Sequence, residues 1–98
     1  MKIIWSPLAI DRVAEIAQYI AQDSLNSAQK WVESIFQVVE QLEKFPKSSR
    51  VIPEIKQDDF REIIHRNYRI IYRLQSEIVS ILTVRHGRQI LPIEEIKA

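Results

Sequence analysis

The sequence contains no cysteine, and glycine occurs only once in its 98 residues. Without cysteine the chain has no disulfide, no thiolate zinc site and no cysteine nucleophile, so a reducing cytoplasm is the expected compartment. No apolar stretch near the N-terminus is long enough for a signal peptide, and no later stretch is long enough to span a bilayer. We therefore expect a cytoplasmic protein with no membrane contact.

Lysine is absent from residues 60–88, although this span holds six arginines and both histidines. It contains only two carboxylates, so its formal charge is +4 in a chain whose net charge is +1. A guanidinium group is permanently charged and forms bidentate contacts with carboxylate or phosphate. The alternative is a solvated face with surface ion pairs, but such pairs contribute only about 0–1 kcal/mol and do not explain the preference for arginine. The span therefore predicts an anionic partner.

Hydrophobic spacing predicts a short strand over Lys2–Trp5 and two amphipathic helices after it. The dipeptide Ser6–Pro7 marks the start of the first helix, because serine caps free N–H groups and proline in the first turn loses no hydrogen bond. We expect this helix to reach about Gln22. After a break at 24–26, the second helix is expected to reach about Phe45, since the proline that follows disfavours helical geometry. Together they predict a helical hairpin over a core.

Three alternating segments predict strands over Phe60–Arg66, Tyr68–Leu74 and Ile78–Arg85. The stretch 46–53, PKSSRVIP, has a proline at each end and no periodicity, so a loop is expected there. The order β-α-α-β-β-β predicts a single α+β domain over residues 1–98, in which the helical hairpin packs on one face of an antiparallel sheet. The last strand is apolar on both sides and is expected to be central.

In the middle strand, Arg69 and Arg73 share one face with Ile71, whereas Tyr72 points to the other face. We expect the tyrosine face to meet the helices and the arginine face to remain open. Basic side chains of the neighbouring strands would then join the same surface. The candidate residues for contact with an anionic partner or target are Arg61, Arg69, Arg73, Arg85, His86 and Arg88.

Two further features concern the end of the chain. Gly87 is expected either to adopt a positive φ at the exit of the last strand or to give a target room to approach. The apolar tail from Ile90 to Ile96 is expected to pack back on the helices; alternatively, it forms an edge that a partner strand or helix covers.

Four segments give the chain a resemblance to the RelE/ParE superfamily of bacterial toxins from type II toxin–antitoxin modules. They are IIWSPLAIDRVAEIAQYIA, FPKSSRVIPEI, FREIIHRNYRIIYRL and ILTVRHGRQ, and in order they cover nearly the whole chain. The resemblance implies a small α+β toxin held inactive by a cognate antitoxin, whose C-terminal segment wraps over it. It also implies plasmid stabilisation or growth inhibition as the role, with a homodimer or a heterotetramer with antitoxin as the assembly.

The two branches of this superfamily differ in their targets. RelE-like members cleave mRNA in the ribosome, whereas ParE-like members are associated with poisoning DNA gyrase. Arg69 sits where the nuclease branch has a phosphate-contacting arginine, but many non-nuclease members share it. No tyrosine follows Tyr72, and the lysine pair of the nuclease branch is absent. The resemblance therefore favours a ParE-like binder of gyrase without enzymatic activity.

Two alternatives remain open at the level of the sequence. One is a metal-independent, ribosome-dependent endoribonuclease, with Arg69, Arg85, His86 and Arg88 as catalytic candidates and His86 as either an acid–base group or a structural residue. The other is an inactive family member that only binds antitoxin. No cofactor or metal is expected, because the two histidines and the aspartates at 58–59 lack the spacing of metal ligands.

Overall fold

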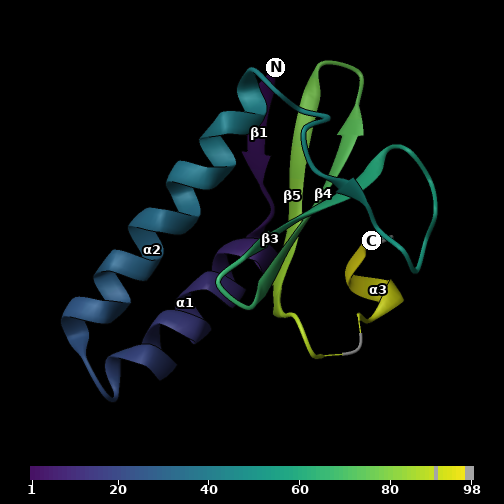
Figure 1. Cartoon of the computed structure of the whole chain (residues 1–98). Coiled ribbons are helices and arrows are strands. Elements are labelled where there is room, and N and C mark those ends of the chain that lie inside the picture. Colours follow the sequence, from purple (N-terminus) through teal and green to yellow (C-terminus); the bar gives the residue numbers. More distant parts are fainter. Residues whose placement is uncertain (90, 97–98) are drawn as a thin grey trace.

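The computed structural model describes residues 1–89 and 91–96, and it has the predicted α+β architecture (Figure 1). A helical pair packs on one face of a five-stranded sheet, and a short third helix lies on the opposite side. The elements are β1 (Lys2–Trp5), α1 (Pro7–Ala21), α2 (Leu25–Glu40), the 3₁₀ turn η1 (Gln41–Glu43), β2 (Arg50–Val51), β3 (Phe60–His65), β4 (Tyr68–Gln75), β5 (Ile78–His86) and α3 (Ile93–Ile96).

The sheet has the strand order β1-β5-β4-β3-β2. The predicted strands β3, β4 and β5 pair in antiparallel fashion, as expected. The strand β2, which was expected to be part of a loop, pairs antiparallel with β3, and β1 pairs with β5 in parallel. A parallel neighbour needs a crossover connection, and the chain passes through both long helices between β1 and the rest of the sheet. The sheet is therefore mixed, and β5 is an internal strand between β1 and β4.

The helix α1 begins at the predicted residue and ends at Ala21, one residue before the expected Gln22. The helix α2 begins at Leu25, inside the expected break, and ends at Glu40, where η1 continues it to Glu43 instead of the expected Phe45. The Ser6 hydroxyl accepts a hydrogen bond from the Ala9 amide at 3.0 Å, and it donates one to the Leu82 carbonyl at 2.9 Å, which ties the start of α1 to β5. The Ser24 hydroxyl caps α2 by accepting from the Ser27 amide. Within the described ranges, no helix is long and apolar enough to cross a membrane.

The main core lies between the helical hairpin and the sheet. Tyr72 is buried in it, as the alternation in β4 predicts. Trp31 of α2 is also buried, and its ring centroid lies 5.2 Å from that of Tyr68. Trp5 packs against Phe36 of α2 at 4.8 Å between ring centroids. The other large buried members are Ile35, Val39, Leu42, Ile70, Val79, Ile81 and Val84.

A second, smaller core covers the opposite face of the sheet, so the expectation of an open face is wrong. Ile71 and Phe60 point to this face and are buried beneath Ile52, Leu91 and Ile96. The tail therefore packs on the sheet and not on the helices, and Figure 1 shows α3 on the side away from α1 and α2. Two large apolar side chains on a sheet face need cover from water, and the 52–55 turn and α3 supply it. Ile90, part of the predicted tail, lies outside the described residues.

The hairpin between β3 and β4 turns through Arg66 and Asn67, which have φ values of 47° and 69°. Two successive positive φ values match the right-handed twist of a two-residue hairpin, so β3 ends one residue earlier than predicted. Gly87 has no positive φ, so the first of the two alternatives expected for it is wrong. Its amide instead donates to the Asn67 carbonyl at 2.7 Å, and a Cβ on Gly87 would lie 3.2 Å from that oxygen. The lack of a side chain at Gly87 lets its backbone lie close to the Asn67 carbonyl.

Candidate functional site

The six candidate residues do not converge on one surface. Arg69 and Arg85 are cross-strand partners on the face opposite the helices. Arg61 pairs across the sheet with Tyr72, which faces the main core, so Arg61 leaves the sheet on the helix side. The prediction of guanidinium groups gathered on one uncovered surface is therefore wrong.

Arg61 is buried and binds the chain's own loops. Its Nε donates to the Asp58 carbonyl at 2.9 Å, and Nη1 donates to the Ser49 carbonyl at 2.7 Å. Nη2 donates to the Asp58 carboxylate at 2.6 Å. These bonds tie the segment before β2 to the segment before β3, which is a structural role.

Arg69 is the centre of a chain of four ionised side chains. Its two terminal nitrogens each donate to one carboxylate oxygen of Glu54 at 2.8 Å, and its Nε donates to Glu62 at 2.6 Å. Glu62 also accepts from Nε of Arg50 on β2. The side chain of Arg69 is 8% exposed and that of Glu62 is 0% exposed. The hydrogen bond from Arg69 lowers the pKa of Glu54, and the bonds to Glu54 and Glu62 raise the pKa of Arg69, in spite of burial.

Arg73 and Arg85 also have carboxylate partners within the chain. Arg73 donates from Nε to Asp59 at 2.9 Å, and its guanidinium lies 4.7 Å from the centre of the Phe60 ring. Arg85 donates from Nη1 to Glu95 of α3 at 3.2 Å. Four of the predicted contact residues are thus neutralised by acids that lie outside residues 60–88.

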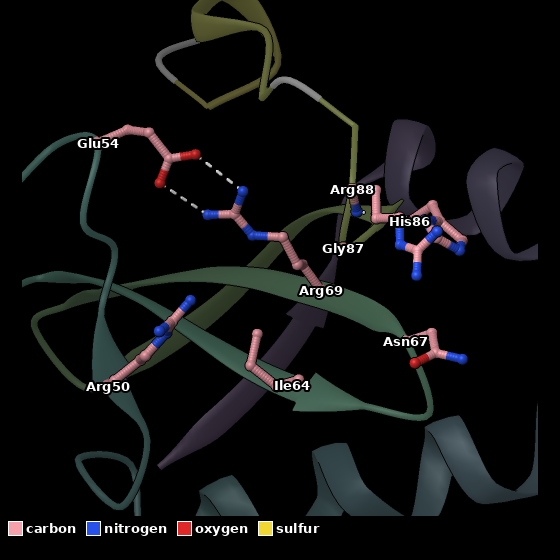
Figure 2. Close-up of a pocket in the computed structure, with 8 residues that line it drawn as sticks. All are labelled: Arg50, Glu54, Ile64, Asn67, Arg69, His86, Gly87 and Arg88. Atoms are coloured by element: carbon pink, nitrogen blue, oxygen red, sulfur yellow. Dashed lines mark hydrogen bonds and ion pairs between the residues drawn. The ribbon is translucent and has the colours of Figure 1, made fainter.

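His86 and Arg88 remain at the surface, beside a cavity of about 420 Å³. Figure 2 shows them on the opposite side of Arg69 from Glu54. Nδ1 of His86 accepts from the Arg88 amide at 3.2 Å, and its ring packs edge-on against Tyr68 at 5.4 Å. The neutral ring therefore carries its proton on Nε2. The cavity is lined by Arg50, Glu54, Ile64, Asn67, Arg69, His86, Gly87 and Arg88.

The charged side chains that line this cavity are mainly cations, and the described residues place no oriented general base in it. Three of its eight lining residues are arginines and one is a carboxylate. A general base needs a partner that orients it, and within the described part of the chain the His86 ring is hydrogen-bonded to backbone alone. In residues 1–89 and 91–96, no group of three or more His, Asp or Glu side chains is placed to hold a metal ion.

The structure also contains a groove that was not predicted from the sequence. An apolar groove of about 620 Å³ lies between α1 and α2. Its floor is formed by small and aliphatic residues of α1 and α2, and polar side chains of Gln18, Gln29 and Glu33 border it. The spacing of alanines in both helices was the available signal, because small side chains leave a hollow between two helices. Its apolar lining comprises Ala17, Ala21, Leu25, Ala28 and Val32.

A helical pair packed on a five-stranded mixed sheet matches the ParE-like fold. A ParDE toxin–antitoxin system from P. aeruginosa contains a chain of similar fold, with a TM-score of 0.73 over 88% of this chain and 95% of that one. Its sequence identity is 19%, so the likeness concerns the fold.

Residues 3–91 match the family described as the ParE toxin of the type II toxin–antitoxin system parDE. Y4kP, a toxin candidate of Sinorhizobium fredii, is 36% identical over 93 residues, which cover 93% of each chain. The chain therefore belongs to the ParE family, and it is the toxin of a type II toxin–antitoxin system.

Proposed function

We propose that this toxin acts in the cytoplasm by binding DNA gyrase, and that a cognate antitoxin neutralises it. The choice of gyrase as the target rests on the ion pairs that Arg69 forms within the chain. In the nuclease branch this position contacts phosphate, whereas here both ends of the guanidinium are occupied by Glu62 and Glu54. A nuclease needs a free cation for the developing phosphorane charge and a positioned base. The ion-paired arrangement of Arg69 supports a binder.

The test is a supercoiling assay with purified gyrase and the purified toxin. We expect dose-dependent loss of supercoiling, and we expect a Glu40→Gln control, which changes one exposed charge on α2, to inhibit equally. Normal supercoiling together with ribosome-dependent cuts in mRNA would overturn the choice of gyrase.

A ribosome-dependent endoribonuclease is the second candidate, because the cavity does bring Arg69, His86 and Arg88 together. This alternative predicts that His86→Gln and Arg88→Ala each abolish toxicity while the far-ultraviolet circular dichroism spectrum and the melting temperature stay unchanged. Toxicity that survives both substitutions excludes it. If expression of the wild-type chain causes no growth defect at all, the third candidate, an inactive antitoxin-binding member, is favoured instead.

Antitoxin contact is proposed at the groove between α1 and α2 and at the cations that are not buried. An amphipathic segment covers an apolar groove through residues spaced by three and four, and acidic residues of the same segment would be drawn to Arg50 and Arg88 at the surface. Association should therefore slow as salt rises. Association and dissociation rates that are both insensitive to ionic strength would contradict this electrostatic contribution. Light scattering of the complex tests whether it is a heterotetramer.

A further inference from the structure

A second cavity lies between α1 and the end of β5, and it is separate from the cavity beside Arg69. Its volume is about 420 Å³, within the range of about 300–1,000 Å³ that is usual for small-ligand pockets. The two cavities share only His86 among their lining residues. The ion pairs of Arg69 are therefore not part of this second cavity.

Aromatic and aliphatic side chains form much of the wall of this second cavity. Tyr19 of α1 is 70% exposed, whereas Tyr68 of β4 is partly buried. Burial and, secondarily, the neighbouring Tyr19 raise the pKa of Tyr68, so its phenol is neutral at neutral pH. Val84 and Ile16 also line the cavity. Because aromatic rings pack against one another in edge-to-face or offset arrangements, these walls suit a flat aromatic ring.

The polar wall of the same cavity contains a guanidinium group that is only partly neutralised. Within the described residues, the Arg85 side chain makes one hydrogen bond, from Nη1 to Glu95 at 3.2 Å. The same oxygen of Glu95 accepts from Arg12 at 2.9 Å, and the other oxygen accepts from Thr83 at 2.8 Å. One carboxylate therefore serves two guanidinium groups.

The Nε–H group of Arg85 is a buried donor without an acceptor in residues 1–89 and 91–96. Most buried donors in proteins have a partner, so an unpaired donor on a cavity wall calls for an acceptor from outside the chain. Arg69 shows the contrast, since it bonds one carboxylate through Nε and another through its terminal nitrogens. An anion in the cavity would complete the bonding of Arg85.

We propose that this second cavity binds an aromatic carboxylate, with its ring against Tyr19 and Tyr68 and its carboxylate on Arg85. Guanidinium groups bind carboxylates in bidentate fashion. A free aromatic acid and the C-terminal aromatic residue of a polypeptide both present this chemistry. The proposal does not depend on the proposed action on gyrase.

The charges around the cavity favour a single negative charge on the ligand. Arg12, Arg85 and Glu95 together carry +1 at neutral pH, which one carboxylate balances. Glu15 also lines the cavity, and its side chain is 62% exposed. A phosphate monoester carries roughly −1.5 to −2 charge, so these two carboxylates oppose it more strongly than they oppose a carboxylate ligand.

The test is an NMR titration of the nitrogen-15-labelled full chain with N-acetyl-L-tryptophan. The matched probe is N-acetyl-L-tryptophanamide, which keeps the ring and lacks the charge. The acid should shift the amide signals of Val84, Arg85 and His86 in a saturable manner. It should bind at least about tenfold more tightly than the amide probe, because a hydrogen bond to a charged group is lost with the carboxylate.

Arg85→Gln tests the charged contact. This variant should bind the acid about tenfold more weakly than wild type does, and it should bind the acid and the amide probe with equal affinity. Loss of the preference with retention of amide binding is a result that general loosening of the fold does not give. Arg88→Gln removes a nearby positive charge that lines only the other cavity, and it should keep the wild-type preference.

Tyr19→Ala tests the ring contact at an exposed position, so it stays informative even if Arg85→Gln does not fold. It should weaken both probes by about two- to tenfold, the usual contribution of an aromatic pair. Phe45→Ala removes an aromatic side chain that is 63% exposed and does not line the cavity, and it should have no effect.

Three results would overturn the proposal. They are equal affinity of the wild type for the two probes, Tyr19→Ala binding as tightly as wild type, and tighter binding of adenosine monophosphate than of N-acetyl-L-tryptophan at the same amides. Free L-tryptophan distinguishes the two sources of the ligand. If it binds more tightly than the N-acetyl form, the ligand is a free aromatic acid; if it binds more weakly, the ligand is the end of a polypeptide.

Discussion

At the scale of single residues, the buried carboxylate of Glu62 holds the two neighbouring guanidinium groups in place. Its carboxylate is fully buried and accepts hydrogen bonds from Arg69 on one oxygen and Arg50 on the other. A buried ion pair adds little to stability when intact, but removing one partner leaves an uncompensated charge away from water. Glu62 therefore ties β2, β3 and β4 together.

Replacing Glu62 by glutamine should destabilise the protein by about 3–5 kcal/mol, because Arg69 and Arg50 then lose their shared counter-charge. Urea denaturation at neutral pH measures the change. The matched control is Glu40→Gln at an exposed site on α2, for which we expect less than about 0.5 kcal/mol. A loss below about 1 kcal/mol for Glu62→Gln would show that the ion chain is not buried as described.

His65 gives the stability a pH dependence near neutrality. Burial and, secondarily, the charge of Arg66 lower its pKa below the ordinary 6.5, and its Nε2 is 3.0 Å from the Ser34 hydroxyl. The unfolded chain therefore takes up a proton at a higher pH than the folded chain does. This contribution to stability is present above pH 6.5 and is lost as the pH falls from there through the lowered pKa of the folded state.

His65→Gln should remove that contribution while keeping a polar group near Ser34. Urea midpoints at pH 7.5, 6.0 and 5.0 should fall more steeply for wild type than for His65→Gln. All other titratable groups are common to the two proteins, so their contributions cancel from the difference. Parallel pH profiles for the two proteins would mean that His65 is not held neutral by the fold.

At the scale of elements, α3 depends on its contacts, because a four-residue helix is not stable alone. Leu91 and Ile96 fill the second core. Glu95 accepts hydrogen bonds from Arg12 on α1 at 2.9 Å and from Thr83 on β5 at 2.8 Å. Burial opposes ionisation of Glu95, but these bonds and the charges of the nearby arginines outweigh it and lower its pKa.

Glu95→Gln should release α3 at a cost of about 1.5–3 kcal/mol, the usual value of hydrogen bonds to a charged group. The neighbouring Glu94 is exposed, so Glu94→Gln is the matched control and should leave α3 in place. Hydrogen exchange of the amides of residues 91–96 follows the release directly. Equal protection in the two variants would contradict the role of Glu95.

Hydrophobic periodicity in the sequence predicted some of these elements and missed others. The strand Lys2–Trp5 was predicted with its observed ends, and each of β3, β4 and β5 ends within one residue of the prediction. The strand Arg50–Val51 and the helix Ile93–Ile96 each span only about one period of a sequence pattern, which is too short for periodicity to reveal, so they were missed. The parallel pairing of β1 was also missed, because direction within a sheet depends on the crossover and not on the strand itself.

At the scale of the whole molecule, the basic span 60–88 is neutralised by acids brought to it from elsewhere. Residues 54–59 supply Glu54, Asp58 and Asp59, and the tail supplies Glu95. Charge counted along the sequence overstated the positive surface, since the folding of a loop and a tail onto the sheet is not encoded in any local pattern. The preference for arginine was correctly connected with carboxylates, but these carboxylates belong to the chain itself.

The measurement that tests this account most directly is the mobility of individual guanidinium groups by nitrogen-15 NMR. With Arg69 bonded to Glu62 and in bidentate fashion to Glu54, its terminal N–H groups should rotate slowly and give separate, exchange-protected signals. Arg88, at the surface, should give averaged signals that exchange rapidly. If Arg69 rotates and exchanges as fast as Arg88, the locked ion chain does not exist, and the argument against a nuclease is wrong.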